Sequence, residues 1–321
     1  MWSRSYVRAL SQNLQLIKMV KHFIDLDKIS TKELRQILAL AKKIKKEKYS
    51  NILAGKHLAM IFEKTSTRTR VSFEVGINQL GGRAIVMNSG DMQLGKGETV
   101  ADTAQVLSRF VDGIMIRSNS HQTIIDLAEN SRVPVINALS DFSHPCQIIA
   151  SILTIEEHLG KISGKKLAWF GDANNVLNSY IHAAKAFDYE LAIATPNGYD
   201  FCDIEIKKAQ KNGAKIQVCK NAKDAAKNAD VLITDTWFSM GDAAAKDKKL
   251  RDKKLKELMP YQVNSELMKL AKKTAIFTHC LPAYRDFEVT AEIIDSKKSV
   301  VFDEAENRLH AQKAVLATLL K

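Results

Sequence analysis

The sequence contains no long run of apolar residues. Although 45% of its 321 residues are hydrophobic, no stretch approaches the ~18 consecutive apolar positions that a membrane-spanning helix needs. Glycine and proline are also scarce, at 14 and 5 residues, which excludes collagen-like and low-complexity chains. We therefore expect an ordered globular protein, and its length indicates about two domains at roughly 150 residues each.

Cysteine is rare, and its spacing excludes two further classes of protein. The four cysteines lie far apart and form no C-x-x-C pair. So few thiols in a chain of this length do not make a disulfide framework, and we expect free thiols in a reducing compartment, most simply the cytoplasm. The cysteines and the eight histidines show no zinc-site spacing. We therefore predict no metal site and no cofactor.

Acidic residues are too few to balance the basic ones, and the net charge is +12. Much of the excess lies in the lysine-rich runs 41–48 and 246–256. We interpret these runs as solvated helix faces or a loop, because acids interrupt both and no aromatic residues are interleaved with the lysines. A nucleic-acid-binding protein remains the remote alternative.

The first 18 residues contain no acid and carry two arginines and a lysine. This composition resembles a weak mitochondrial presequence, which would place the protein in the matrix. However, Met19 directly precedes sequence of folded character. We expect residues 1–18 to be a disordered extension or the product of a mis-assigned start codon.

From residue 56 onward, short apolar runs alternate with amphipathic stretches. The runs predict strands at 57–62, 83–87, 113–117, 133–138, 166–171, 190–196, 215–220, 230–235, 275–280 and 299–304. Helices are predicted at 67–80, 98–110, 120–130, 145–159, 175–187, 203–212, 222–228, 262–271 and 304–321. This alternation is typical of parallel sheets. We expect an α/β protein with two domains, 19–150 and 151–303, followed by a C-terminal helix.

The first strand runs into a dense polar stretch, "EKTSTRTR" at 63–70. A helix follows, and the unpaired N–H groups of a helix N-terminus favour a phosphate or carboxylate. Ser66, Thr67 and Thr69 add hydroxyl donors. Arg68 adds a planar fork for two oxyanion contacts. A simple N-cap at Ser66 or Thr67 would explain one hydroxyl but not the whole cluster. We therefore predict an anion site.

Further polar residues follow other strands, where ligands of parallel sheets bind. Arg117 ends one strand, which alone is weak evidence. His144 and Gln147 stand around Pro145 at the start of a helix, where His144 could equally be a cap. The segment 171–175 ("GDANN") lacks the G-x-G-x-x-G pattern, which excludes the simplest dehydrogenase.

The last such segments lie near the C-terminus. "DTWFSMG" (235–241) follows a strand and could close over a ligand. "HCLP" (279–282) follows another, and Cys280 is a candidate nucleophile for which the sequence shows no paired base. Arg308, near the start of the final helix, is a further cation. Donors for a phosphorylated anion thus gather in the first half, and groups able to hold an amino acid gather in the second.

Five motifs together make a specific pattern. They are "STRTR" (66–70), "HPCQ" (144–147), "DTWFSMG" (235–241), "HCLPA" (279–283) and "ENRLHAQKA" (306–314). In this order they resemble the aspartate/ornithine carbamoyltransferase family, and most closely its ornithine branch. The resemblance extends from about Met19 to Lys321.

The resemblance implies a function for each matching residue. The residues implied to bind carbamoyl phosphate are Ser66, Thr67, Arg68, Thr69, Gln93, Arg117, His144, Pro145, Cys146, Gln147, Cys280, Leu281 and Arg308. Those implied to bind ornithine are Asn175, Asp235, Ser239 and Met240. Arg117, His144, Asp235 and Cys280 are the implied catalytic residues.

The implied reaction transfers the carbamoyl group to the δ-amine of ornithine, giving citrulline and phosphate. No metal or cofactor is needed, and the C-terminal helix packs back on the first domain. The match at Gln93 implies a homotrimer, because in the family this glutamine reaches a neighbouring subunit's site. Aspartate and putrescine are alternative acceptors, which "DTWFSMG" and "HCLP" disfavour.

Overall fold

The structure is a computed structural model, and it describes residues 21–47, 49–88, 90, 92, 97–199, 202–238 and 247–321. The predictions made for residues 1–18, Gln93, Ser239 and Met240 lie outside these residues. No helix among the described residues is long and apolar enough to cross a membrane.

The first half of the chain forms a four-stranded parallel sheet in the order β2-β1-β3-β4. Its strands and flanking helices are β1 (His57–Phe62), α3 (Thr67–Gln79), β2 (Arg83–Asn88), α4 (Val100–Leu107), β3 (Gly113–Arg117), α5 (His121–Asn130) and β4 (Val135–Leu139). Phe62 at the end of β1 pairs with Arg117 at the end of β3. This register brings Arg117 beside the polar stretch that follows β1.

The second half forms a five-stranded parallel sheet in the order β7-β6-β5-β8-β9. Its elements are β5 (Lys166–Phe170), α7 (Asn175–Phe187), β6 (Glu190–Ala194), α8 (Asp203–Lys211), β7 (Lys215–Val218), α9 (Ala222–Ala226), β8 (Val231–Thr234), α10 (Lys248–Leu258), η4 (Met259–Tyr261), α11 (Ser265–Leu270), β9 (Ile276–Thr278) and α12 (Ala291–Ile294). The ends of β5, β8 and β9 are neighbours. The polar segments that follow these three strands therefore meet.

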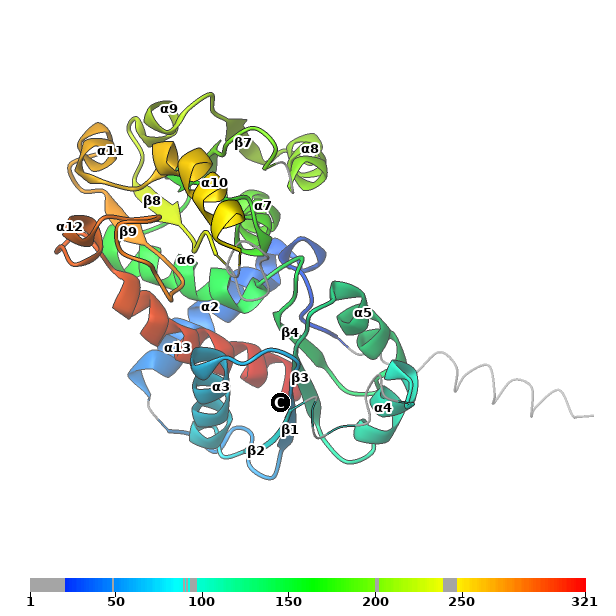
Figure 1. Cartoon of the computed structure of the whole chain (residues 1–321). Helices are drawn as coiled ribbons and strands as arrows, with labels where there is room; N and C mark the ends of the chain where they lie inside the picture. The colour runs from blue at the N-terminus through cyan, green and yellow to red at the C-terminus, as the bar shows by residue number, and fades with distance from the viewer. Residues whose placement is uncertain are drawn as a thin grey trace, which may run out of the picture.

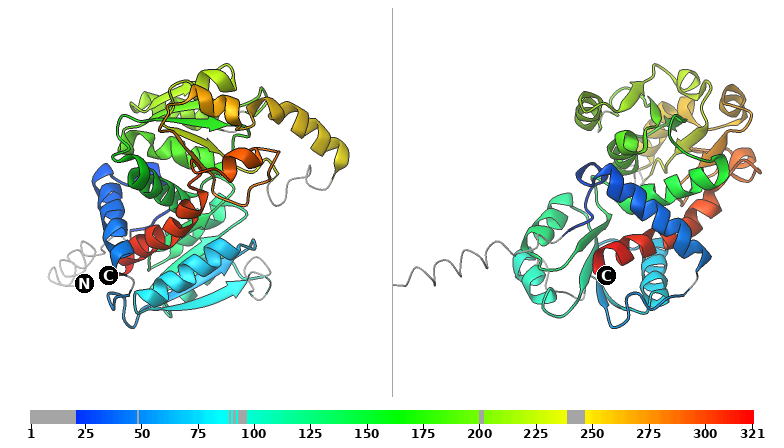
Figure 2. Two further views of the ribbon diagram at one scale, coloured as in Figure 1. Left: turned by 90° about the vertical axis from the view of Figure 1, so that its left-hand side faces the viewer. Right: turned by 180° about the vertical axis from the view of Figure 1, so that it is seen from behind.

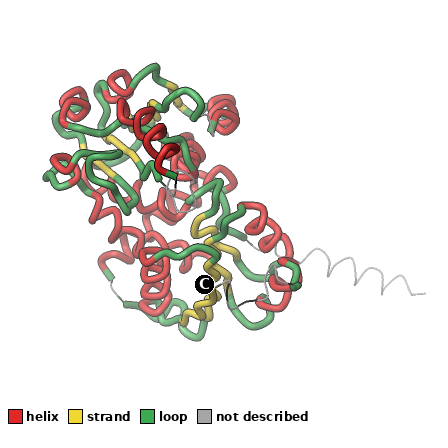
Figure 3. Tube along the Cα trace, viewed as in Figure 1, coloured by secondary structure: helices red, strands yellow, loops and turns green. Residues whose placement is uncertain are grey.

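Helices lie between the two sheets (Figures 1 and 3). They are η1 (Leu26–Lys28), α2 (Thr31–Lys46), α6 (Pro145–Leu159) and α13 (Val301–Leu320). The C-terminal helix α13 packs against α2 and α3 of the first half and against α6, as Figure 2 shows from two further sides. The predicted return of the C-terminal helix to the first domain is confirmed.

One strand prediction, 299–304, is wrong. Only Ser299 forms an isolated bridge, to Phe277, and α13 begins two residues later at Val301. The β-branched pair Val300 and Val301 resembles a strand, but both side chains are buried. Asp303 lies in the first helical turn, where its charge complements the helix dipole. Helix formation therefore overrides the β propensity of the valines.

Most of the described residues in both lysine-rich runs are helical. The run at 41–48 lies mainly in α2, whose apolar side is buried. The run at 246–256 lies mainly in α10, whose lysines are mostly exposed. The interpretation of the runs as solvated helix faces is confirmed for these residues.

Candidate active site

A cavity of about 530 Å³ opens where the polar segments of the two halves face each other. The predicted site residues that line it are Ser66, Thr67, Arg68, Arg117, His144, Asn175, Asp235, Cys280, Leu281 and Arg308. They come from both sheets and from α13. The fold thus brings together most of the predicted residues that the structure describes.

The polar stretch after β1 forms the N-terminus of α3. Ser66 is the N-cap residue, and its hydroxyl accepts a hydrogen bond from the Thr69 backbone N–H at 3.2 Å. The free N–H groups of this first turn and the helix dipole favour an anion. Arg70 instead pairs with Glu74, 3.7 Å away on the exposed side of α3. The stretch is therefore both a helix cap and a possible anion cradle, and Arg70 is not part of it.

Three arginines from distant parts of the chain gather at this cradle. Arg117 and Arg308 are 8% and 3% exposed, and both donate to the Thr69 hydroxyl, at 3.4 and 2.8 Å. Among the described residues, neither they nor Arg68 has a carboxylate within ion-pair distance. Burial and then the charge of Arg308 lower the pKa of Arg117 to about 10. Unpaired buried cations are costly, so the site is suited to a ligand with more than one negative charge.

His144 stands at the N-terminus of α6, beside the arginines. Its backbone N–H donates to Ser179 Oγ at 2.7 Å, but its side chain forms no helix cap. His144 is 3% exposed, and its Nδ1 has no hydrogen-bond partner among the described residues. Burial and the charges of Arg308 and Arg117 hold the pKa of His144 well below its usual value. The imidazole is therefore neutral at neutral pH and available to a polar ligand.

Four predicted residues lie behind the cavity surface. Thr69, Pro145, Cys146 and Gln147 are buried. Burial raises the pKa of the Cys146 thiol to about 12, so this thiol remains protonated. The side-chain carbonyl oxygen of Gln147, Oε1, is buried and has no hydrogen-bond partner in the described part of the chain. An unsatisfied buried acceptor is costly, and Gln147 is therefore a candidate for ligand contact.

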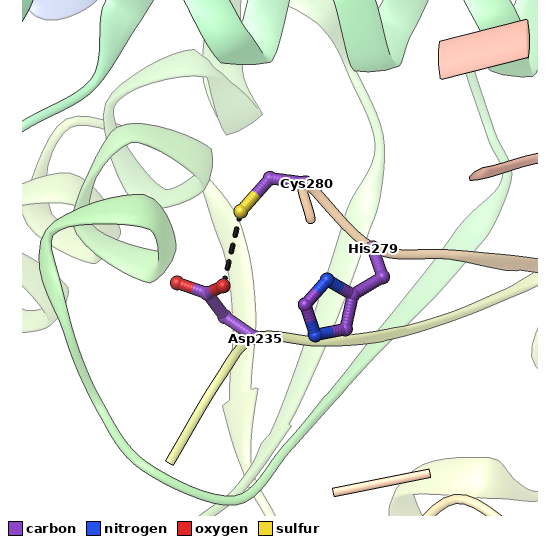
Figure 4. Close-up of side chains that lie close together, drawn as sticks. All are labelled: Asp235, His279 and Cys280. Carbon is purple, nitrogen blue, oxygen red and sulfur yellow. Dashed lines mark hydrogen bonds between the residues drawn. The ribbon is translucent and has the colours of Figure 1, made fainter. Parts of the chain in front are cut away.

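At the other end of the cavity, Asp235 receives hydrogen bonds from neutral donors. Cys280 Sγ donates to its Oδ1 at 3.0 Å (Figure 4), and Asn174 Nδ2 donates to its Oδ2 at 2.8 Å. Burial and the charge of Asp235 raise the pKa of the Cys280 thiol well above its usual value. Cys280 is thus a protonated donor that orients Asp235, and it does not have the thiolate that a cysteine nucleophile needs.

Asp235, His279 and Cys280 also place one ligand atom each within 4.8 Å of one another. These side-chain types suit a transition metal such as zinc. However, His279 Nδ1 already accepts from the Leu281 N–H at 2.9 Å, and its Nε2 lies 3.3 Å from Glu288 Oε1. Both ring nitrogens therefore face protein groups, and we assign no metal to this site.

Gly171 allows the segments after β5 and β8 to pack closely. Its φ is +97°, and a Cβ added there would lie 2.5 Å from Trp237 Nε1. Trp237 is fully buried and packs in an aromatic cluster with Phe238 under helix α10. Position 171 therefore has room only for glycine. This lets Trp237, which follows β8, pack directly against the backbone that follows β5.

Sequence reasoning missed two residues that line the cavity, Lys64 and Asn174. Burial followed by the charge of Arg117 lowers the pKa of Lys64. Asn174, and not its predicted neighbour Asn175, contacts Asp235, whereas Asn175 Nδ2 donates to Ser140 O at 2.7 Å. The pair Asn174-Asn175 was visible in the sequence, but only the helix cap formed by Asn174 decides which one faces Asp235.

Comparison with protein families matches the chain in two parts. Residues 21–157 match the carbamoyl-P binding domain of aspartate/ornithine carbamoyltransferase, and residues 163–319 match the Asp/Orn binding domain of the same family. The two matches correspond to the two sheets and divide within the helical region that joins them.

Individual relatives agree with this match. An ornithine carbamoyltransferase of Rhodopseudomonas palustris is 53% identical over 94% of this chain and 97% of its own length. One of Brucella abortus is also 53% identical, over 94% and 96%. The solved structure of an ornithine carbamoyltransferase from Pyrococcus furiosus has a TM-score of 0.86 and 46% identity, covering 94% of this chain and 97% of its own. This chain belongs to the aspartate/ornithine carbamoyltransferase family.

Proposed function

We propose that this protein is an ornithine carbamoyltransferase, which transfers the carbamoyl group of carbamoyl phosphate to the δ-amine of L-ornithine. The observation that carries the proposal is the cluster of Arg68, Arg117 and Arg308, which has no carboxylate partner among the described residues. The names of the relatives support the same activity. The products are citrulline and phosphate.

Carbamoyl phosphate lies with its phosphate at the N-terminus of α3 in this proposal. The backbone and hydroxyl groups from Ser66 to Thr69 hold the phosphate oxygens, together with Arg68. Arg117 and His144 reach the carbonyl oxygen. The carbamoyl NH₂ meets acceptors on the Gln147 side chain and on the backbone at Cys280 and Leu281; Arg308 adds a further cation.

Ornithine occupies the opposite end of the cavity. Asp235 is the carboxylate that attracts an amino group there, and Asn174 and Cys280 hold it in place. Asn175 lines the same end. Ser239 and Met240, which lie outside the described residues, complete the proposed contacts to the α-amino acid group.

The reaction is a direct transfer between two ligands held side by side. The neutral δ-amine attacks the carbamoyl carbon, a C–N bond forms, and the C–O bond to phosphate breaks. Arg117 and the neutral ring of His144 stabilise the oxyanion that develops, and the α3 cradle stabilises the departing phosphate, which takes up the amine proton. Holding both substrates in one cavity removes much of the entropic cost of their encounter.

Three further features belong to the proposal. The carbamoyl-phosphate half comprises residues 19–150 with the C-terminal helix, and the ornithine half comprises residues 151–303. The protein assembles as a homotrimer in which Gln93 reaches a neighbouring site. It acts in the cytoplasm, in a step of the arginine-biosynthesis or urea-cycle type.

One assay separates this proposal from its alternatives. The protein is incubated with carbamoyl phosphate and, in turn, with ornithine, aspartate and putrescine, and both phosphate and the carbamoylated product are measured. Citrulline formation with ornithine alone is the expected result. Turnover with aspartate or putrescine instead of ornithine would show that this other amine is the acceptor. Absence of turnover with all three amines would reject the proposed carbamoyltransferase activity.

A further inference from the structure

We propose that Glu304 is a positioning residue that makes the site selective for a carbamoyl over an acetyl group, by holding the Gln147 amide with its carbonyl oxygen free. The inference rests on the proposed function, because it concerns the group that carbamoyl phosphate presents to Gln147. Neither the sequence motifs nor the relatives assign a role to Glu304.

Glu304 joins three parts of the molecule from a position that is 2% exposed. Its Oε1 accepts from Gln147 Nε2 at 3.0 Å and from the Ser151 hydroxyl, both on α6. Its Oε2 accepts from the His279 backbone N–H at 3.1 Å. Glu304 itself is in the first turn of α13. One carboxylate thus ties α13 to α6 and to the segment that begins at His279.

The carboxylate determines which way the Gln147 amide faces. An ionised carboxylate only accepts hydrogen bonds, so the NH₂ end of the amide must turn toward Glu304. The carbonyl end, Oε1, is consequently left buried, with no hydrogen-bond partner from any residue that the structure describes. Burial raises the pKa of Glu304, whereas its hydrogen bonds from Ser151 and Gln147 favour the ionised form. The result is a fixed acceptor in the first turn of α6, three residues after the N-cap residue His144.

A fixed acceptor recognises a donor and rejects a methyl group. Carbamoyl phosphate carries NH₂ at the position where acetyl phosphate, which is otherwise nearly the same shape, carries CH₃. The NH₂ group would satisfy Gln147 Oε1, whereas a methyl group would leave this acceptor desolvated and unpaired. The contact of Glu304 with the His279 N–H also restrains the neighbouring backbone at Cys280 and Leu281, the other proposed acceptors.

The test measures a ratio of affinities, which a loss of general stability does not change. Freshly dissolved carbamoyl phosphate and acetyl phosphate are titrated separately into the full chain by calorimetry, without ornithine. We expect wild type to prefer carbamoyl phosphate, and Glu304→Leu to lower this preference about 10-fold, the value of one hydrogen bond to a buried acceptor. Gln147→Leu should lower the preference for carbamoyl phosphate equally. The double variant should lower this preference no further than either single change, because both changes remove the same contact.

Thr154→Val provides the matched control. Thr154 Oγ1 accepts from Asn307 Nδ2 at 2.8 Å, another buried polar contact between α6 and α13, but it touches neither Glu304 nor Gln147. We expect this variant to leave the affinity ratio unchanged. The conservative Glu304→Gln, which keeps one acceptor oxygen, should retain part of the preference and guards against a Leu variant that fails to fold.

The outcomes distinguish this inference from the function on which it rests. If the Glu304 variants weaken both ligands equally and keep the wild-type ratio, Glu304 is only structural and the inference is overturned, while the proposed function stands. If wild type binds neither acyl phosphate, the proposed function falls, and this inference falls with it.

Discussion

The two ends of the cavity differ in charge. At the end built by β1, β3 and α13, the buried cations Arg117 and Arg308 share one neutral partner, the Thr69 hydroxyl. At the end built by β5, β8 and β9, the carboxylate of Asp235 accepts from the neutral donors Asn174 and Cys280, whereas the second carboxylate that lines this end, Asp172, is paired with Lys254. One end therefore favours an anion and the other an ammonium group, so two substrates of opposite charge can be held in a defined order along one cavity.

Replacing Arg68 should break the cationic end most severely. We expect Arg68→Ala to lower the rate of citrulline formation by roughly 10²–10³-fold, because a charge-assisted contact to the departing phosphate is lost. The temperature of thermal unfolding without ligand should not fall, since Arg68 repels Arg117. Steady-state kinetics and calorimetric scanning test the two parts.

Arg70→Ala is the matched control, since Arg70 lies two residues along the same helix and is paired with Glu74 on its exposed side. Its activity should stay within about twofold of wild type, as is usual for exposed ion pairs. Near-normal turnover in Arg68→Ala, or an equal loss in both variants, would contradict the anion cradle.

Replacing Asp235 should impair ligand binding only at the opposite end of the cavity. We expect Asp235→Asn to raise the KM for ornithine by about 10²-fold, because a buried carboxylate that pairs with an ammonium group contributes several kcal/mol. The affinity for carbamoyl phosphate, measured by titration without ornithine, should be nearly unchanged. A parallel loss of carbamoyl phosphate binding would show that the two ends are not separate.

The boundary between the two ends depends on close backbone packing at Gly171. We expect Gly171→Ala to lower the free energy of unfolding by about 2–3 kcal/mol, since it adds both an unfavourable φ and a contact with Trp237. Gly198→Ala is the control, because its φ of +84° is similar but, apart from its chain neighbours, no atom of the described residues lies within 4 Å of the added Cβ. Equal losses in the two variants, measured by urea denaturation, would argue against the contact with Trp237.

The sequence predicted the strands better than the contacts between segments. β1 and α6 have the predicted bounds, because an apolar run and a proline at the helix start are local signals. The segment 299–304 was predicted as a strand because its valines suit one, and the packing of α13 that decides otherwise is not local. The same error concealed Glu304, whose partners on α6 are more than 150 residues away.

For the polar residues of the candidate site, too, local signals could be predicted and the contacts between segments could not. Ser66, Arg117 and Cys280 could be named because each ends a strand or begins a helix, and parallel strands end at one edge of a sheet. The choice between Asn174 and Asn175 could not be made, since two identical side chains stand side by side and only cap geometry separates them. Sequence therefore indicates where a site lies, and the fold determines which atoms face it.

Replacing Cys280 should have the smallest effect on turnover of the replacements considered. It tests whether this thiol serves only as a neutral donor to Asp235. Since burial and Asp235 raise the pKa of this thiol, it is protonated below and around neutral pH, and it forms a thiolate only at a pH well above its usual range. Iodoacetamide should therefore react slowly at neutral pH and faster only in strongly alkaline buffer. Cys280→Ser keeps a donor to Asp235, so we expect it to retain turnover within about 10-fold of wild type. Abolished turnover in this variant, or rapid alkylation at neutral pH, would instead indicate a nucleophilic thiolate and a covalent carbamoyl intermediate.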